Sequence, residues 1–353
     1  MSGDFGPGNG ILDRLIESGA EESRPIRAIF ELTYRCNLGC SFCYCIGREG
    51  AELGLDEVCR TIDGLQSEGC MFLTLSGGEI LCREDFPEIA RHARGRGLAL
   101  ELKTNGTLVD ADASKLIAGL YPFNVDVSIH AADAEGHDRV TRVPGSFDGA
   151  LNGVRLLREE GVPVTLKSLL TRENYADYER IRALAQELGA DCLTDITVSA
   201  SQDGGCSAHA HRLRDGQLAD FMERNRADML DLLAETLAAE DFREAADCHQ
   251  CNAGLTTCCI SPYGDVYPCV QFLRAVGNIR EKDFPAIWRG SEELSRIRDI
   301  RLRDLAVCGS CELLPYCFRC PGLADLEDGD MLGPSSEACR QARACRDIFE
   351  KRG

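Results

Sequence analysis

The sequence predicts an α/β fold in which a partial (β/α)6 TIM-like barrel is followed by a small, irregular, cysteine-rich domain. Between residues 26 and 199, apolar strand-like runs alternate with amphipathic helical segments. This alternation is typical of a parallel sheet with right-handed crossovers. The second observation is that 11 of the 20 cysteines lie after residue 247. Six β/α units are fewer than the eight of a closed barrel, so we expect a curved, incomplete one.

The elements follow one another in a regular order. We expect strands over residues 26–34, 71–75, 98–103, 124–130, 162–170 and 192–199. Helices are expected over residues 55–65, 86–94, 111–120, 147–160 and 175–188. The first helix shows the basis of these assignments, because its apolar residues recur three and four positions apart and Gly69 follows it.

Alternation within the strands predicts where their two faces lie. Asn124, Asp126 and Ser128 share one face of their strand, and valines occupy the other. Glu101 and Lys103 repeat the pattern one strand earlier. The apolar faces must pack against the outer helices, so the polar faces line the inside. This favours a cavity for a polar cofactor and substrate over an open sheet with one solvated face.

Composition excludes several classes of protein. The 353-residue chain has a formal net charge of −19, which argues against a nucleic-acid-binding surface. It has no apolar run long enough to span a membrane. No secretory signal precedes residue 30, so we expect a cytoplasmic protein. Metal binding therefore explains the 20 cysteines better than disulfides do.

The distribution of cysteines and helical patterns divides the chain. We expect an N-terminal segment over 1–24, the barrel over 25–205, a bridging loop and helix over 206–247, and the cysteine-rich domain over 248–353. Residues 206–216 are polar and predict a mobile loop. His209 and His211 lie in it, and we favour a plain loop over a metal site there.

The first cysteine group follows the first strand as Cys36-x3-Cys40-x2-Cys43. Three thiolates on one short loop can bind three irons of a [4Fe-4S] cluster and leave the fourth iron open. Zinc prefers four protein ligands, or three with a water, and often histidine, which this loop lacks. Cys45 follows Cys43 too closely for easy ligation, and we treat it as a bystander.

This loop, with Phe42 before its last cysteine, resembles the radical S-adenosylmethionine (SAM) superfamily. Ser76-Gly77-Gly78-Glu79 ends the second strand as the GGE motif of that family does. Asn105 follows the third strand, and Ser128 lies on the fourth. The segment 137–147 also resembles the family's fourth crossover. These elements all lie at carboxyl ends of strands, where barrel sites assemble, although Gly77-Gly78 alone would be an ordinary turn.

The resemblance implies radical chemistry. SAM would bind the open iron of a [4Fe-4S] cluster held by Cys36, Cys40 and Cys43, and its reductive cleavage would yield a 5′-deoxyadenosyl radical that abstracts hydrogen from the substrate. The SAM contacts that we expect are Phe42, Gly77, Gly78, Glu79, Asn105, Ser128 and Lys167. An interior ion pair with Glu101 is an equally good interpretation of Lys167. The sequence identifies no catalytic acid or base.

The C-terminal cysteines form an ordered series. It runs Cys248-x2-Cys251, Cys251-x12-Gly264-x4-Cys269, Cys308-x2-Cys311-x5-Cys317-x2-Cys320 and Cys339. The closely spaced pairs do not match a zinc ribbon, whose pairs are further apart. The series resembles the SPASM domain, which follows many radical SAM barrels and typically binds two auxiliary [4Fe-4S] clusters. The usual x3 spacing before Cys320 is x2 here.

The resemblance also implies which cysteines bind which cluster. The ligands of the first auxiliary cluster would be Cys248, Cys251, Cys269 and Cys320, and those of the second would be Cys308, Cys311, Cys317 and Cys339. Cys258 or Cys259 remains an alternative to Cys248, and Cys345 an alternative to Cys339. A structural zinc module is the alternative to the clusters as a whole.

SPASM enzymes mostly modify peptides, so the leading hypothesis is a maturase of a ribosomally synthesised peptide that makes a thioether or C–C crosslink or an epimer. Its cofactors would be SAM and three [4Fe-4S] clusters. A radical SAM enzyme of tetrapyrrole or cofactor biosynthesis is the second hypothesis. A non-enzymatic iron–sulfur or zinc protein is the third, and it leaves the GGE motif unexplained. Val270 follows Cys269 where sulfatase-maturing enzymes have an aspartate, which disfavours that activity.

The same resemblance indicates the partners. About 25 residues precede the first strand, too few for the winged peptide-recognition domain of some maturases. We therefore expect the peptide substrate to bind through a separate recognition protein or at the barrel mouth. A flavodoxin- or ferredoxin-type donor would supply electrons. We expect neither a nucleic acid nor a membrane as a partner.

Overall fold

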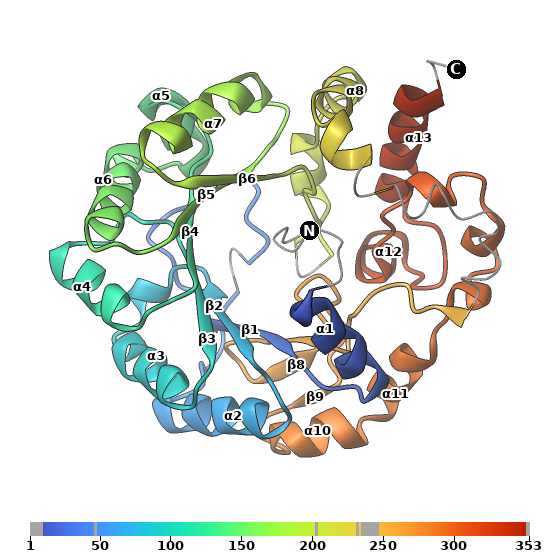
Figure 1. Cartoon of the computed structure of the whole chain (residues 1–353), viewed down its shortest axis with the longest axis horizontal. Coiled ribbons are helices and arrows are strands. Elements are labelled where there is room, and N and C mark those ends of the chain that lie inside the picture. Colours follow the sequence, from blue (N-terminus) through green and yellow to red (C-terminus); the bar gives the residue numbers. More distant parts are fainter. Residues whose placement is uncertain (1–9, 46–47, 202–203, 231–232, 234–246, 351–353) are drawn as a thin grey trace.

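The computed structural model describes residues 10–45, 48–201, 204–230, 233 and 247–350. In this part of the chain, one curved, open sheet has the strand order β6-β5-β4-β3-β2-β1-β7-β8-β9. Helices cover its outer face (Figure 1). The strands are β1 Arg27–Thr33, β2 Phe72–Gly77, β3 Ala99–Thr104, β4 Asn124–Ser128, β5 Val164–Leu169, β6 Asp191–Asp195, β7 Thr257–Ile260, β8 Asp265–Tyr267 and β9 Gly277–Asn278.

The helices agree with the expected alternation. They are α1 Ile11–Glu21, α2 Leu55–Ser67, α3 Phe86–Gly95, α4 Ala111–Gly119, α5 Ala134–Thr141, α6 Ser146–Glu159, α7 Tyr178–Glu187, α8 Asp215–Arg224, α10 Phe284–Gly290, α11 Glu292–Asp299, α12 Pro321–Asp328 and α13 Ser336–Glu350. The prediction of an α/β partial barrel is confirmed, because β1 to β6 pair in parallel and in chain order. The added helix α5 lies in the crossover between β4 and α6.

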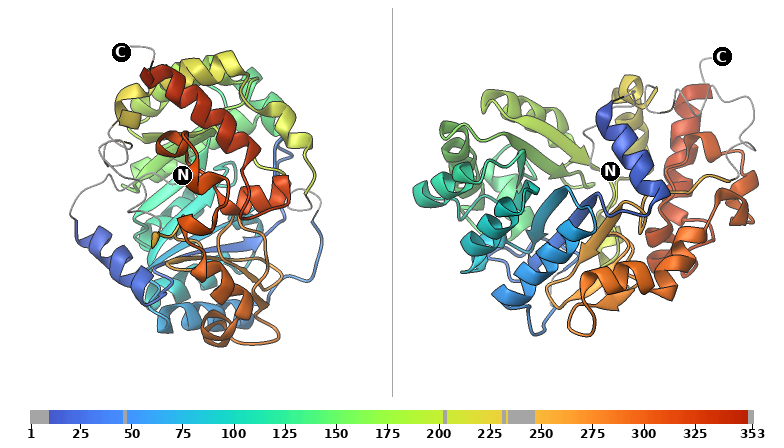
Figure 2. Two further views of the ribbon diagram at one scale, coloured as in Figure 1. Left: turned by 90° about the vertical axis from the view of Figure 1, so that its right-hand side faces the viewer. Right: turned by 60° about the horizontal axis from the view of Figure 1, so that its bottom comes forward.

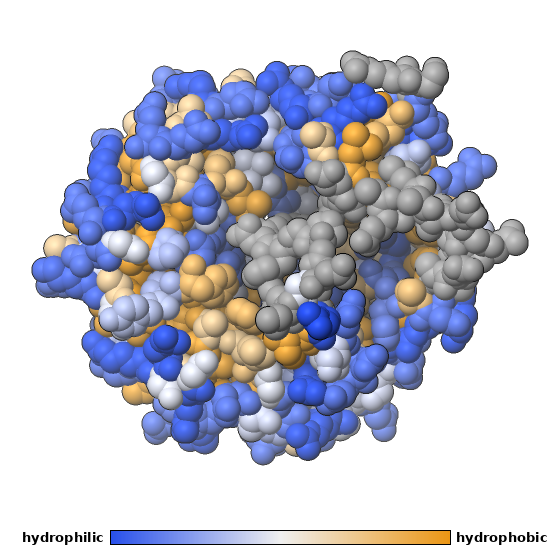
Figure 3. Space-filling view, in the orientation of Figure 1, coloured by the Kyte–Doolittle hydropathy of each residue, from blue (hydrophilic) through white to orange (hydrophobic). Residues whose placement is uncertain are grey.

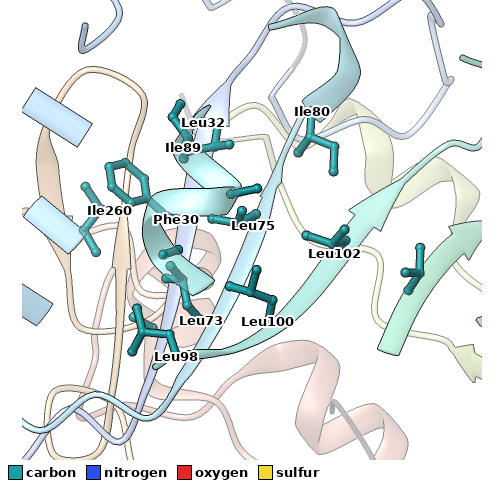
Figure 4. Close-up of a cluster of buried hydrophobic side chains, with 14 of the residues drawn as sticks. Phe30, Leu32, Leu73, Leu75, Ile80, Ile89, Leu98, Leu100, Leu102 and Ile260 are labelled. Atoms are coloured by element: carbon teal, nitrogen blue, oxygen red, sulfur yellow. The ribbon is translucent and has the colours of Figure 1, made fainter. Parts of the chain in front are cut away.

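The main core lies between the sheet and its outer helices. Phe30, Leu73 and Leu100 point outward from β1, β2 and β3, and α3 adds Ile89 (Figure 4). Each of these side chains is fully buried. A buried side chain of this size contributes about 2 kcal/mol to stability. The apolar faces therefore anchor the sheet and leave its polar faces for the interior.

The cysteine-rich region begins inside the barrel sheet, which the sequence did not indicate. Strand β7 pairs in parallel with β1, with Arg27 opposite Thr257, and β8 and β9 follow as antiparallel neighbours. The strand β7 has the sequence TCCI, and its adjacent cysteines, residues 258 and 259, are buried in the sheet. The β1 side of the barrel is thereby extended by residues from the C-terminal half.

The helices α12 and α13 lie on the open side of the sheet, between β6 and β9 (Figures 1 and 2). A carboxylate oxygen of Glu327 in α12 accepts a hydrogen bond from the backbone N–H of Ala200, just beyond β6. Asp325, in the same helix, pairs with Arg274, which follows β8. The helix α12 thus connects the two separated edges of the sheet.

The structure shows short ordered elements within residues 206–216, where the sequence predicts a mobile loop. Residues Ser207–His211 form a 3₁₀ helix. His209 lies 3.1 Å from Glu327, Arg212 lies 2.7 Å from the same carboxylate, and His211 pairs with Glu173. Partners this distant in sequence are invisible to a local composition argument. The predicted bridging helix corresponds to α8, and the later part of the prediction, residues 231–232 and 234–246, lies outside the described residues.

The surface agrees with the acidic composition. Hydrophilic side chains cover most of the outer rim of the face seen in Figure 3. Within the described ranges, we find no helix long and apolar enough to cross a bilayer.

Candidate active site and cluster-binding cysteines

The turn after β2 requires glycine at two successive positions. Gly77 has a φ of +132°, and a Cβ atom there would lie 2.2 Å from the backbone oxygen of Thr33. A Cβ atom on Gly78 would lie 2.4 Å from the backbone oxygen of Arg35. The backbone N–H of Gly78 donates to the Thr33 oxygen at 2.8 Å. Because of this close approach, the turn packs directly against the segment that leads to Cys36.

Glu79 connects the ends of β2 and β3. Its side chain is fully buried, and its carboxylate accepts hydrogen bonds from the backbone N–H groups of Leu81 and Asn105 and from the hydroxyl of Thr104. Burial raises the pKa of Glu79, and the three donors oppose this rise. An amino group of SAM would have to share these oxygens, so the carboxylate also has a structural role.

The cysteine loop is attached to the end of α5. The backbone N–H groups of Gly39 and Ser41 donate to the carbonyl oxygens of Thr141 and Val140, at 2.9 and 3.1 Å. Arg142 follows with a φ of +61°, an uncommon conformation for arginine that sharply ends the helix. The loop that carries the thiols is therefore fixed by β1 on one side and α5 on the other.

The structure brings the three thiols of this loop together. Burial, together with smaller contributions from the neighbouring Cys43 and Cys36, raises the pKa of Cys40 to about 12. Burial also raises the pKa of Cys36. The thiols of Cys36 and Cys40 are therefore protonated near neutral pH in the metal-free chain, and iron binding must displace their protons. Three converging thiols on one anchored loop suit a [4Fe-4S] cluster with an open iron. Cys45 is close as well, with its sulfur 3.5 Å from that of Cys43.

The residues expected to contact SAM divide into two groups. Asn105 lies beside the cysteine loop, with its side-chain nitrogen 3.7 Å from the Cys36 sulfur and 2.9 Å from Asn37 Oδ1. The ring of Phe42 meets that of His130 edge to face at 5.0 Å. Lys167 is different, because its Nζ lies 3.5 Å from Asp126 inside the barrel. Ser128 ends β4 on the interior face.

The interior of the barrel is lined by a ladder of charged side chains. Lys103 pairs with Asp126 and lies 3.4 Å from Glu101, whose other oxygen accepts a hydrogen bond from Thr74 at 2.6 Å. Burial disfavours the charge on Lys103, but Asp126 and Glu101 outweigh it, so its pKa is raised. The pKa of Lys167 is lowered by burial and by Lys103. The alternation of polar residues therefore does line an interior, as expected.

Two groups near the cysteine loop were not singled out from the sequence. Glu31 in β1 is buried and accepts hydrogen bonds from the hydroxyls of Tyr34 and Tyr44. His130 and His137 stack with ring centroids 5.8 Å apart, and burial lowers the pKa of His130 to about 3 and that of His137 to about 4. The one signal in the sequence that could have identified His130 and Glu31 was the alternation of polar residues along their strands, since both lie on the polar face.

The four cysteines assigned to the second auxiliary cluster line one cavity. This cavity, of about 100 Å³, lies among Cys308, Cys311, Cys317 and Cys339. Burial raises the pKa of Cys317 to about 11, and Cys339 and Cys308 contribute. Four thiols around a space suit a polynuclear cluster, whereas a single zinc ion would hold all four sulfurs about 2.3 Å from one point. Cys345 is buried in α13 and does not line this cavity.

Three of the four cysteines assigned to the first auxiliary cluster are neighbours. Burial raises the pKa of Cys251 to about 11, with smaller contributions from Cys269 and Cys320. Cys248 is exposed, and its backbone oxygen accepts a hydrogen bond from Leu302. The two alternatives to Cys248, residues 258 and 259, are buried within β7. The structure thus places Cys251, Cys269 and Cys320 near one another, and the identity of a fourth ligand stays a prediction.

Comparisons with known proteins identify two domains. The radical SAM superfamily model matches residues 30–185, and the iron-sulfur cluster-binding SPASM domain model matches residues 248–321. An AdoMet-dependent heme synthase of Methanosarcina barkeri is 31% identical over 89% of this chain and 96% of its own length. The mycofactocin maturase MftC of Mycolicibacterium smegmatis is 30% identical over 83% of this chain and 77% of its own length.

A solved structure shares the fold. Streptococcus suis SuiB bound to its precursor peptide SuiA superposes with a TM-score of 0.71 at 17% identity, over 96% of this chain and 84% of that chain. The matched ranges include the loop of Cys36, Cys40 and Cys43, the glycine turn and the cysteines from 248 to 320. The chain belongs to the radical SAM superfamily and carries an iron–sulfur cluster-binding SPASM domain C-terminal to its radical SAM domain.

Proposed function

We propose that this radical SAM enzyme modifies a ribosomally synthesised peptide, by a thioether or C–C crosslink or by epimerisation. The observation that carries the proposal is the charged ladder inside the barrel, formed by Glu101, Lys103, Asp126 and Lys167. The exposed fractions of the Lys103 and Lys167 side chains are 24% and 28%, so both reach the interior space.

A peptide suits such a wall better than a macrocycle does. Backbone amides and polar side chains of a peptide exchange hydrogen bonds with alternating ammonium and carboxylate groups. The flat apolar face of a tetrapyrrole would instead desolvate these charges without pairing them, which is costly. Ligand sites for apolar molecules are lined mainly by hydrophobic and aromatic side chains, unlike this one. The relatedness to mycofactocin maturases agrees with a peptide substrate.

The cofactors in this proposal are SAM and three [4Fe-4S] clusters. Cys36, Cys40 and Cys43 would hold the cluster at which SAM binds, and SAM would supply the 5′-deoxyadenosyl radical that abstracts a hydrogen atom from the substrate. The chain itself holds the cluster loop against α5 and the glycine turn and surrounds the reaction space with the charged ladder. The second set of four cysteines and the Cys251 set would hold the two auxiliary clusters.

The partners belong to the same proposal. The structurally similar SuiB was solved bound to the precursor peptide SuiA. Here a peptide substrate would enter at the barrel mouth or be delivered by a separate recognition protein. A flavodoxin- or ferredoxin-type protein would reduce the clusters.

Tetrapyrrole chemistry is the second candidate, and one observation favours it. The heme synthase of Methanosarcina barkeri is 31% identical over nearly its whole length. An Fe-coproporphyrin III synthase of the same organism is 29% identical over 84% of this chain. Lys103 and Lys167 would then bind propionate groups of the substrate.

One experiment separates the two candidates. The anaerobically reconstituted enzyme is incubated with SAM, a reductant and either a small peptide encoded beside its gene or iron-coproporphyrin III. We expect 5′-deoxyadenosine in both cases, because uncoupled SAM cleavage needs no correct substrate, but a mass change only in the peptide. An unchanged peptide together with a decarboxylated porphyrin would refute the proposal. A matched Lys103→Met variant should lose peptide modification and keep the uncoupled cleavage.

A further inference from the structure

Arg319 lies between the two sets of cysteines assigned to the auxiliary clusters. It follows Cys317 of the second set and precedes Cys320 of the first, in the segment that is one residue shorter than the usual SPASM spacing. Its side chain also lines the cavity framed by the second set. The shortened segment therefore brings one permanent positive charge to both groups of thiols.

The guanidinium group is held in place by three acceptors. Its Nε atom donates to the backbone oxygen of Gly333 at 2.8 Å, and a terminal nitrogen donates to that of Met331 at 2.6 Å. The other terminal nitrogen donates to the side-chain oxygen of Gln250. Gln250 precedes Cys251 and lines the cavities on both sides. The charge therefore occupies a fixed position in the wall between the two cysteine sets.

The charge is not neutralised by the acceptors that hold it. Arg274, on the same domain, pairs with the carboxylates of Asp325 and Glu293. The hydrogen bonds that hold Arg319 go instead to neutral oxygens. Arg319 lines the cavity framed by the second set. It also directly precedes Cys320 of the first set, and it donates a hydrogen bond to Gln250, which precedes Cys251, so the charge adjoins both sets.

We propose that Arg319 is a positioning residue that sets the reduction potentials of both auxiliary clusters together. The proposal rests on the two auxiliary clusters of the proposed function. A fixed cation stabilises the more negative, reduced form of an iron–sulfur cluster and thus raises its potential. Because one charge acts on both clusters, removing it shifts both potentials in the same direction. The difference between the two potentials, which drives electron exchange between the clusters, is thereby kept.

Redox titration of the reconstituted enzyme tests this role. Potentials are read by electron paramagnetic resonance in Arg319→Gln and Arg319→Lys, and Arg296→Gln, an exposed arginine on α11, is the matched control. We expect both auxiliary potentials to become more negative in Arg319→Gln and to stay close to wild type in Arg319→Lys and in the control. If Arg319 acted only through packing, the potentials would change equally in Arg319→Lys and Arg319→Gln, although only the glutamine variant loses the charge.

Each other result has a defined meaning. Unshifted potentials in a fully loaded Arg319→Gln protein, or a shift of one cluster alone, would overturn the proposal. If Arg319→Gln does not hold the auxiliary clusters but Arg319→Lys does, the charge acts in cluster assembly rather than on the potentials, and the proposal is overturned. If neither variant holds them, the proposal fails. Wild-type protein that binds only about four irons would refute the auxiliary clusters themselves, a failure of the proposed function that iron analysis distinguishes.

Discussion

The two regions that carry cysteine groups are supported in different ways. The loop of Cys36, Cys40 and Cys43 is anchored between a strand end and α5, above a core that includes Phe30 and Leu73. The region after residue 300 has short 3₁₀ helices at 302–304, 308–310 and 314–316, and its cysteines surround a cavity. The described hydrophobic clusters contain few of its side chains.

This difference indicates what metal does in each region. In the barrel, the hydrophobic core and backbone hydrogen bonds hold the cysteine loop in place, so a cluster bound there is needed for the chemistry and not for folding. In the C-terminal region, hydrophobic burial is sparse, so the clusters must contribute much of the folding free energy, as metals do in other small cysteine-rich modules.

The strongest test of this contrast is to remove the second auxiliary site. The double variant Cys308→Ser/Cys311→Ser should lose hydrogen-exchange protection across residues 301–350 while β1 to β5 stay protected. Structural metal sites of this kind contribute on the order of 10 kcal/mol, more than this region can replace. Cys59→Ser, on α2, is the control. Unchanged protection over 301–350 would show that the region folds without its cluster.

The barrel site should give the opposite result. Cys36→Ala should lower SAM cleavage by about 10³-fold, or roughly 4 kcal/mol, and remove about four irons, while the thermal unfolding midpoint of the barrel changes little. The assay combines 5′-deoxyadenosine quantification, iron analysis and calorimetry. Retained SAM cleavage would contradict the assignment of Cys36, and a large drop in the unfolding midpoint would contradict the independence of this loop from its metal.

The glycine turn tests how strictly the barrel site is built. Gly77→Ala introduces a Cβ atom 2.2 Å from the Thr33 oxygen at a φ of +132°, which should cost about 3 kcal/mol. The matched Gly97→Ala variant also has a positive φ but meets no atom within 4 Å, so it should cost about 1 kcal/mol. Denaturant unfolding measures both. If both variants lost the same free energy of unfolding, the close contact with the Thr33 oxygen would not contribute to the cost of Gly77→Ala.

The ladder inside the barrel distinguishes ion pairing from SAM binding at Lys167. Lys167→Met should lower stability by about 1 kcal/mol, since the pair with Asp126 is partly exposed, and should leave the dissociation constant of SAM unchanged. Isothermal titration and thermal unfolding measure the two effects. A SAM affinity that falls tenfold with unchanged stability would instead place Lys167 in the SAM site. Lys115→Met, on α4, is the control.

The smallest expected effect depends on pH. The pKa of Cys40 is raised from 9.0 to about 12 in the folded, metal-free chain, so the unfolded chain releases this proton first. The stability is therefore fully present below about pH 9 and is lost as the pH rises toward 12. The unfolding midpoint of the metal-free protein should therefore fall as the pH rises from about 9 toward 12, and this fall should be smaller in Cys40→Ser. A rising midpoint in the metal-free protein would contradict this sign.

Much of this molecule could be predicted locally. The alternation of Asn124, Asp126 and Ser128 indicates the polar interior, because side chains on a strand alternate whatever surrounds it. The Gly77-Gly78 turn and the first cysteine spacing are likewise local signals. The pairing of Lys167 with Asp126 and the hydrogen bonds to Glu79 were not predictable, since these side chains meet only after the sheet curves. The same holds for Arg212 and Glu327, which are 115 positions apart.

By itself, the sequence determined the α/β fold, the barrel motifs and the cysteine spacing, because each depends on periodicity or on contacts between near neighbours. Only the tertiary structure decided that β7 extends the barrel sheet at β1, that α12 connects the two sheet edges, and that Arg319 lies between two cysteine sets. These features depend on which distant segments pack together, and free energy gained by burial and pairing at long range leaves no local pattern in the chain.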